Sequence, residues 1–363
     1  MTLSCNRVEA INPNSLQTTC LHRQTNTCNA VFEGGGVKGI AIAGAVLGME
    51  QAGYQFKNMA GTSAGAIVAA LVAAGYTGTE IRELLGSLNY KKFLDKSYFL
   101  GYPGKAINIM LRYGLYPGDY FTSWLDDLLK AKGISTFGDI RQPNVIAKYT
   151  YRFQAITSDI SACKLLVLPG DLKYFGINPD TFNIARAVRM SMSIPLVFVP
   201  FRLKDYYGNE HLLVDGGVLS NYPIWLLDDE TIDPSYPTFG FKLQECEQLV
   251  YGKCQPLQIK SLIGYLKNLL NTMLEAHDDY HVAHTKGDLE RTIAIPTTIH
   301  VSGQTKAINA TDFGISAIES DALFKNGLTA VNAFLTNWDF NYWKENYREL
   351  LRHRMNFRPP GIL

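Results

Sequence analysis

Two short strand-like segments, each followed by glycines and then by a helix-like stretch of small residues, occupy residues 29–75. The first segment, 29–32, leads into the glycines of 34–36, and the second, 55–60, leads into the sequence GTSAG at 61–65. Strands that alternate with helices at this spacing pair in parallel through right-handed crossovers. We therefore expect an α/β fold with three layers, α/β/α, around a mainly parallel central sheet.

The rest of the chain contains no internal repeat, no low-complexity tract and no proline- or serine-rich linker. A long helix is expected over 256–290. The economical division is a polar leader at 1–28, a catalytic domain at 29–320 and a C-terminal helical extension at 321–363, packed on the same domain.

Composition excludes several classes of protein. Hydrophobic residues make up 47% of the chain, so a large core is expected, and the net charge of +1 gives no support for a nucleic-acid partner. The six cysteines form no CxxC pair, which argues for reduced thiols in a cytoplasmic protein. The N-terminus lacks the apolar core of a Sec signal peptide. The uncharged stretch 58–79 has only about half of the ~20 apolar residues that a transmembrane helix needs.

The sequence GTSAG places Ser63 in a turn between an expected strand and an expected helix. Gly61 and Gly65 allow a strained backbone and a close approach of the two elements, as in a nucleophile elbow. The free N–H groups and the positive end of the following helix favour negative charge beside Ser63. A serine that only caps a buried helix is the alternative.

Three glycines without side chains follow the first strand: Gly34, Gly35 and Gly36. The sequence GGGVKG fits a dinucleotide fingerprint, but the acidic residue expected ~20 positions later is missing. A phosphate-binding P-loop is excluded because Gly39, and not Ser or Thr, follows Lys38. We interpret the glycines as an oxyanion hole, since bare N–H groups one strand from Ser63 can stabilise a developing negative oxygen. A tight turn with a helix cap is the alternative.

Asp215, in the sequence LLVDGG, is a stronger candidate than any histidine for accepting the proton of Ser63. An apolar strand delivers its carboxylate to a turn at 216–217, on the same sheet edge as Ser63 if that strand is parallel to its neighbours. His211 lies four residues earlier, about 13 Å away at ~3.3 Å per residue. An ordinary turn aspartate is the alternative.

The remaining histidines offer weaker sites. His277, His281 and His284 share one polar helical face without an obvious further ligand, so we expect no metal. A Ser-Asp-His triad would draw on this cluster, on His300 or on His353. None of these histidines follows a strand on a glycine-marked loop, so the proton acceptor is more simply Asp215.

Together these motifs resemble the patatin-like phospholipase family. The residues that carry the resemblance are GGGVKG at 34–39, GTSAG at 61–65, SMSIPLVFVP at 191–200 and DGG at 215–217. The likeness covers roughly residues 29–240 and is weaker to about 315. Val37 stands where the family often has glycine, which is a minor departure.

The resemblance implies a Ser–Asp dyad that hydrolyses lipid acyl esters without a metal, a cofactor or a catalytic histidine. Carried over to this chain, Ser63 is the nucleophile and Asp215 is the general base. Gly35 and Gly36 are the main oxyanion donors. Lys38 matches the family's basic position, where it either contacts a phosphate headgroup or pairs internally.

The function expected is therefore a lipid acyl hydrolase of the phospholipase A or lysophospholipase type. Its substrate is a lipid or a membrane surface, and its location is cytoplasmic with peripheral membrane contact. An α/β-hydrolase-type esterase with a Ser-Asp-His triad and a catalytically silent lipid-binding module remain as alternatives. Aromatic residues mixed with lysines at 90–121 suit an interfacial patch or a packed helical subdomain. Residues 220–227 suit an acyl channel or the core.

Overall fold

The structure is a computed structural model. It describes residues 26–88, 90–93, 111–228, 233–244, 272, 287–301 and 303–355. Nearly all of the expected leader at 1–28 and most of the helix expected over 256–290 lie outside the described residues.

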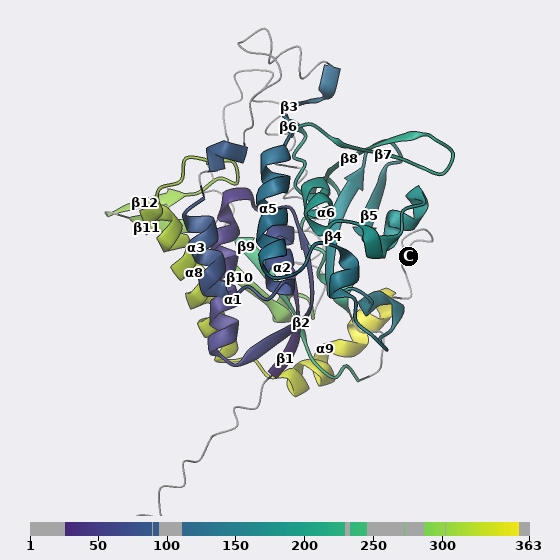
Figure 1. Cartoon of the computed structure of the whole chain (residues 1–363). Helices are drawn as coiled ribbons and strands as arrows, with labels where there is room; N and C mark the ends of the chain where they lie inside the picture. Colours follow the sequence, from purple (N-terminus) through teal and green to yellow (C-terminus); the bar gives the residue numbers. More distant parts are fainter. Residues whose placement is uncertain are drawn as a thin grey trace, which may run out of the picture.

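The described residues form a central mixed sheet of eight strands (Figure 1). These strands are β1 (Asn26–Phe32), β2 (Tyr54–Thr62), β4 (Phe153–Asp159), β5 (Lys164–Leu168), β7 (Phe201–Lys204), β8 (Glu210–Asp215), β9 (Thr238–Gln244) and β10 (Thr292–Pro296). The order is β10-β9-β1-β2-β4-β8-β7, and β5 also pairs with β4. Neighbouring strands from β10 to β4 are parallel, whereas β5 and β8 are antiparallel to β4. The expected α/β class with a mainly parallel sheet is confirmed.

Two small sheets lie outside the central one. β3 (Gly114–Tyr116) pairs in parallel with β6 (Leu196–Phe198), and β11 (Thr298–Val301) pairs antiparallel with β12 (Gln304–Ala307). β3 and β6 lie at the top of the molecule in Figure 1, above α5.

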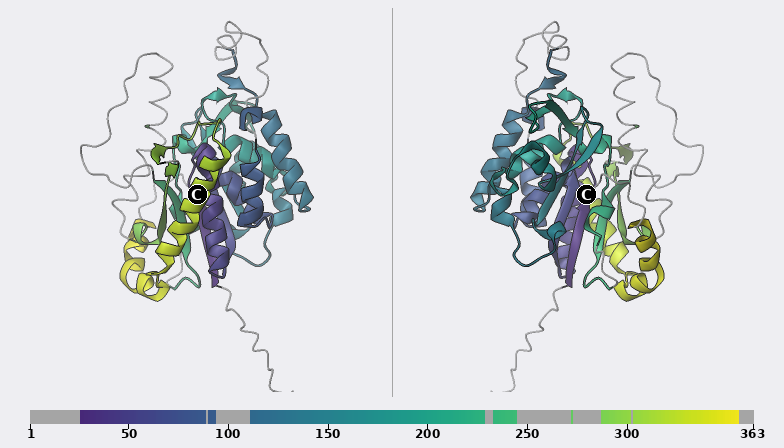
Figure 2. Two further views of the ribbon diagram at one scale, coloured as in Figure 1. Left: turned by 90° about the vertical axis from the view of Figure 1, so that its left-hand side faces the viewer. Right: turned by 90° about the vertical axis from the view of Figure 1, so that its right-hand side faces the viewer.

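Most of the described helices pack in one hydrophobic core with the same face of the sheet. They are α1 (Gly39–Gln51), α2 (Ala64–Ala73), α3 (Gly78–Gly86), α5 (Asp119–Ala131), α6 (Ile184–Ser191) and α8 (Ala317–Leu335). The last described helix, α9 (Phe340–Met355), lies on the other side of the sheet (Figure 2). Among the described residues, no helix has both the length and the apolar character needed to cross a bilayer.

Small residues in α1 explain how a helix is buried on all sides. A Cβ atom at Gly44 would lie 1.9 Å from the carbonyl oxygen of Phe324, and one at Gly48 would lie 2.9 Å from Cβ of Val331. Both partners belong to α8, so these glycines let α8 approach α1 closely. α8 begins at Ala317 with a Ser316–Glu319 capping box, and it packs into the same core as the other helices of this face.

The opposite face of the sheet has its own apolar cluster. Val31, Ala60 and Ile156 project from β1, β2 and β4 and pack against Leu226 and Leu227. The two leucines belong to the short 3-10 helix η8 (Ile224–Leu227). Of the two interpretations of 220–227, the structure therefore supports the core for residues 224–227.

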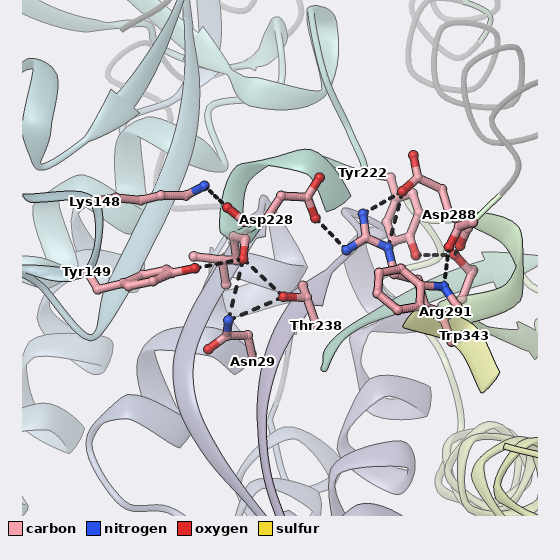
Figure 3. Close-up of polar contacts among 12 residues, drawn as sticks. Asn29, Lys148, Tyr149, Tyr222, Asp228, Thr238, Asp288, Arg291 and Trp343 are labelled. Atoms are coloured by element: carbon pink, nitrogen blue, oxygen red, sulfur yellow. Dashed lines mark hydrogen bonds and ion pairs between the residues drawn. The ribbon is translucent and has the colours of Figure 1, made fainter. Parts of the chain in front are cut away.

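A buried ionic cluster fixes three distant segments on this side of the molecule (Figure 3). The Arg291 guanidinium donates to the carboxylates of Asp228 and Asp288. It also lies 5.5 Å from the ring centroid of Trp343 in α9. Burial lowers the pKa of Arg291, but the two carboxylates raise it more, so the net shift is upward. Arg291 directly precedes β10, so the cluster lies by the start of this strand and away from the C-terminal ends of the parallel strands.

Candidate active site

Ser63 occupies the turn between β2 and α2 with φ 51° and ψ −122°. A positive φ is unusual for a residue with a side chain, and such strain is concentrated at functional sites. A Cβ atom at Gly65 would lie 2.2 Å from the carbonyl oxygen of Phe32, and one at Gly61 would lie 2.4 Å from the carbonyl carbon of Gly65. The two glycines are therefore required by close backbone contacts, as expected for a nucleophile elbow.

Asp215 ends β8 and is buried, with 2% of its surface exposed. The side chain of Ser63 interacts with this carboxylate, and the Gly217 N–H donates to Oδ1 at 2.9 Å. The Asp215 N–H donates to the carbonyl oxygen of Ser193 at 2.9 Å. Burial raises the pKa of Asp215 to about 6, against the opposing effect of its interactions with Gly217 and Ser63. The structure thus joins the two residues that the sequence proposes as nucleophile and base.

Asp215 was expected at the same sheet edge as Ser63 if its strand ran parallel to its neighbours, but β8 runs the other way. β8 is antiparallel to β4, and the register pairs Asp215 with Thr157. β2 is parallel to β4, and its last residue, Thr62, pairs with Ile156. Because Ile156 and Thr157 are adjacent in β4, Asp215 lies level with the end of β2 without a parallel strand.

The glycines of 34–36 lie beside Ser63. A Cβ atom at Gly34 would lie 3.2 Å from Cβ of Ser63. The Gly34 N–H donates to the carbonyl oxygen of Asn221 at 3.1 Å, and Asn221 Nδ2 donates back to the Gly34 carbonyl oxygen at 3.1 Å. The Gly34 N–H is therefore engaged with Asn221 in this structure, and its expected role as an oxyanion donor stays a prediction. The N–H groups of Gly35 and Gly36 donate to no backbone carbonyl of the described residues.

The conformation of the turn depends on glycine at position 36. Gly36 has φ +55°, and a Cβ atom there would lie 2.0 Å from the carbonyl oxygen of Ala310. A Cβ atom at Gly35 would lie 2.2 Å from Cδ1 of Leu243, the end of a flexible side chain that can move. A side chain is thus excluded at Gly36, and the two glycines present bare backbone beside Ser63.

Lys38 lies just behind this turn, in the short 3-10 helix η1 (Gly36–Lys38). It is buried, with 6% of its surface exposed. Burial favours an internal role over contact with a lipid headgroup, and the headgroup contact stays a prediction.

The described histidines are occupied elsewhere. His211 Nδ1 lies 2.6 Å from Asp159 Oδ2 and its Nε2 lies 3.5 Å from Asp205 Oδ2. His300 Nδ1 lies 2.8 Å from the hydroxyl oxygen of Thr305. Within the part of the chain that the structure describes, no histidine hydrogen-bonds to Ser63 or Asp215. The side chains of His277, His281, His284 and His353 lie outside the described residues.

An apolar cavity opens next to the glycine turn and the start of α2. Its lining residues are Gly36, Gly39, Ala64, Ile67, Leu85, Leu88, Phe93 and Trp124. Its volume of about 20 Å³ is enough for roughly one water molecule. Sequence reasoning missed this cavity, because its aromatic wall comes from two helical segments, around 93 and 124, whose packing no local pattern reveals.

Comparison with known proteins places these motifs in a family. A family model for patatin-like phospholipase matches residues 30–228. The uncharacterised protein YqhO of Bacillus subtilis is 40% identical over 316 residues, which cover 86% of this chain and 99% of YqhO. The probable lipid hydrolase 463L of Invertebrate iridescent virus 6 is 26% identical over 53% of this chain and 61% of its own. Among solved structures, VipD from Legionella pneumophila aligns over 85% of this chain and 66% of its own, with a TM-score of 0.49 and 16% identity.

Proposed function

The chain belongs to the patatin-like phospholipase family, and we propose that it is a phospholipase A or lysophospholipase that works through a Ser63–Asp215 dyad. The family suggests hydrolysis of a lipid acyl ester. The observation that carries the finer proposal is the juxtaposition of Ser63 with a buried Asp215 carboxylate whose pKa is raised to about 6.

The first step is attack of the Ser63 oxygen on the ester carbonyl. Asp215 accepts the hydroxyl proton as the bond between oxygen and carbonyl carbon forms. The N–H groups of Gly35 and Gly36 then stabilise the oxyanion, assisted by the N-terminal end of α2. One oxyanion donor of this kind accelerates acyl transfer by roughly 10²–10³-fold.

The second half of the reaction restores the enzyme. Protonated Asp215 gives its proton to the leaving alcohol or lysolipid, and the acyl group stays on Ser63. Asp215 then accepts a proton from water as that water attacks the acyl-enzyme. As the tetrahedral intermediate collapses, Asp215 returns the proton to the Ser63 oxygen, the fatty acid leaves, and the Ser63 hydroxyl is restored.

The raised pKa explains how an aspartate can serve as the base. An ordinary aspartate, with a pKa near 3.9, is too weakly basic to take a serine proton efficiently at neutral pH. Burial moves the pKa of Asp215 to about 6, which is closer to neutral pH and still leaves the carboxylate ionised there. The Gly217 N–H holds one carboxylate oxygen in place.

The acyl chain binds in the apolar cavity beside Gly36 and Ala64. Its wall of Ile67, Leu88 and Trp124 is apolar, as a hydrocarbon chain requires. Since the cavity holds only about one water molecule, binding requires a shift of a side chain such as Phe93 or Trp124.

Release of fatty acid from phospholipid vesicles tests this proposal. We expect wild-type protein to release fatty acid. Ser63→Ala and Asp215→Asn should release it at least about 10³-fold more slowly. Ser87→Ala is the matched control, because Ser87 bonds within the end of α3 and should keep full activity. The position of the released acyl chain then distinguishes the phospholipase types. Full activity of Ser63→Ala would contradict the dyad.

A triad enzyme is the alternative with a distinct test. His211 and His300 have their own partners, so the remaining candidates are the histidines outside the described residues. Alanine at each of these positions should leave fatty acid release within about threefold of wild type. Loss comparable to that of Ser63→Ala would identify a catalytic histidine.

A further inference from the structure

A cationic pocket lies between the start of α5, the end of α6 and the strands β6 and β7. Its volume is about 460 Å³. Four arginines line it, together with one acidic residue, Asp119: Arg112, Arg186, Arg189 and Arg202. We call this the arginine pocket. It is separate from the apolar cavity beside Ser63.

The chemistry of the arginine pocket suits a phosphate group. Arg186 is exposed, contacts the rings of Phe182 and Phe201, and pairs with no carboxylate among the described residues. Arg202 is exposed and pairs with Glu210. Exposed guanidinium groups bind phosphate oxygens through two parallel hydrogen bonds.

The start of α5 adds to this positive field. Pro117, Asp119 and Thr122 line the same pocket, and no side chain caps the helix at Gly118. A helix of 13 residues leaves N–H groups at its first turn without partners inside the helix. These groups and the helix dipole favour an anion at this end of α5.

Apolar side chains are exposed next to the arginine pocket. Leu111, Tyr113 and Tyr120 are exposed by 67%, 51% and 39%, and they neighbour Arg112 and Asp119 in the sequence. The Arg202 guanidinium lies 5.8 Å from the ring centroid of Tyr113. Exposed tyrosines and an aliphatic residue among arginines are typical of a surface that sits at lipid headgroups. A site for a soluble phosphate would not need them.

The arginine pocket is connected to the dyad through α6 and the residues that follow it. The hydroxyl of Ser191, the last residue of α6, accepts the Ser63 N–H at 3.0 Å. Arg189, which lies four residues before Ser193, donates to the Ser193 hydroxyl. Ser193 in turn accepts the Asp215 N–H at 2.9 Å. The chain that supports the dyad therefore also forms one wall of the arginine pocket.

We propose that the arginine pocket binds the phosphate of an anionic phospholipid in a bilayer, with Leu111, Tyr113 and Tyr120 in the headgroup layer. This inference rests on the proposed function, because it names the surface at which that enzyme meets its lipid. Bound in this way, the protein holds residues 189–193, which support the dyad, against the membrane.

Vesicle co-sedimentation tests the arginine pocket independently of catalysis. The protein is the full chain with Ser63→Ala, so that no lipid is consumed. We expect it to bind vesicles of phosphatidylcholine with phosphatidylglycerol more tightly than vesicles of phosphatidylcholine alone. Arg186→Glu with Arg202→Glu should reduce binding to anionic vesicles at least about tenfold, since basic residues near such a surface attract its negative charge.

A matched charge control separates the pocket from overall charge. Lys164→Glu with Lys173→Glu changes the net charge equally, at exposed sites on β5 and beyond. It should bind at least about fivefold more tightly than the arginine variant, with circular dichroism and melting confirming that both are folded. Equal losses in the two variants, or no preference for anionic vesicles, would overturn the proposal.

Two further experiments identify the source of the phosphate and the role of the apolar residues. Leu111→Ser with Tyr113→Ser should weaken binding to anionic vesicles, because both side chains leave water on docking. If inorganic phosphate raises the melting temperature but anionic vesicles are not bound, the pocket serves a soluble anion and the membrane proposal is wrong. Failure of the proposed function appears separately, as absence of fatty acid release by wild-type protein.

Discussion

The side chain of Ser63 interacts with the carboxylate of Asp215 although their strands, β2 and β8, run in opposite directions. The intervening strand, β4, explains this arrangement, because its adjacent residues Ile156 and Thr157 pair with Thr62 and Asp215 respectively. Register therefore brings the two side chains together, at the point where each strand meets a glycine-containing turn.

The pH dependence of catalysis should follow Asp215. The carboxylate must be ionised to accept the Ser63 proton, and burial raises its pKa to about 6. We expect kcat/KM for a soluble short-chain ester to rise with pH through an apparent pKa near 6 and then to level off. A profile that is flat through this range, in protein that stays folded, would argue against Asp215 as the base.

The stability of the protein should also report the buried carboxylate. The folded pKa of Asp215 lies above its unfolded value. The contribution of this group to stability is therefore fully present below about pH 3.8 and is lost as pH rises through about 6. The shift corresponds to a loss of up to about 3 kcal/mol at neutral pH. Asp215→Asn should therefore gain in the free energy of unfolding relative to wild type between about pH 5 and pH 8. Urea unfolding at both pH values measures this, and a pH-independent difference would contradict it.

His211 should affect stability in the same pH range without contributing to catalysis. Its hydrogen bond to Asp159 raises the pKa of the imidazole, so the stabilisation is present below the unfolded pKa of about 6.5 and is lost as pH rises through the folded value. His211→Gln should lower the free energy of unfolding more at about pH 6 than at about pH 8.5. Activity should stay within about threefold, because His211 lies at the other end of β8; a loss as large as that of Asp215→Asn would point to a triad.

The buried ionic cluster should be essential for stability. Arg291→Met leaves Asp228 and Asp288 buried without their shared cation, which costs about 3–5 kcal/mol. Lys325→Met is the control, because its pair with Asp321 is exposed and contributes no more than about 1 kcal/mol. Chemical denaturation compares the free energies of unfolding of the two variants. Equal losses would show that the cluster does not stabilise the fold.

The nucleophile elbow should tolerate no side chain at Gly65. Gly65→Ala places a methyl group against the carbonyl oxygens of Phe32 and Glu33, so the turn must shift and activity should fall by at least about 10²-fold. Gly86→Ala is the matched control, since a Cβ atom there meets nothing within 4 Å. The control should be neutral or more stable by up to about 1 kcal/mol. Normal fatty acid release by Gly65→Ala would show that the elbow is not strained as described.

Much of the fold was predictable because its signals are local. The alternation of strand, glycine turn and helix of small residues in the first part of the chain indicates parallel pairing, and the strands β1 and β2 are parallel. The glycines of the elbow follow from steric requirements that any such turn imposes. Ser63 and Asp215 stand next to glycine turns, so their positions were also apparent from the sequence.

The remaining features depend on contacts between distant segments. The antiparallel direction of β8 is set by its pairing with β4 and has no signature in its own apolar residues. The hydrogen bond of the Gly34 N–H to Asn221, far along the chain, likewise has no local signal. The arginine pocket joins residues from around 112, 189 and 202, whose proximity follows only from the packing of α5 and α6 and the pairing of β3 with β6.

Labelling with a fluorophosphonate tests the central claim most directly, because this reagent reacts with an activated serine and forms a stable adduct. Peptide mapping by mass spectrometry should place the adduct on Ser63 in wild-type protein at neutral pH. Labelling should be absent in Ser63→Ala and at least about 10²-fold slower in folded Asp215→Asn. An adduct on another serine, or equally fast labelling of Ser63 without the Asp215 carboxylate, would contradict the dyad.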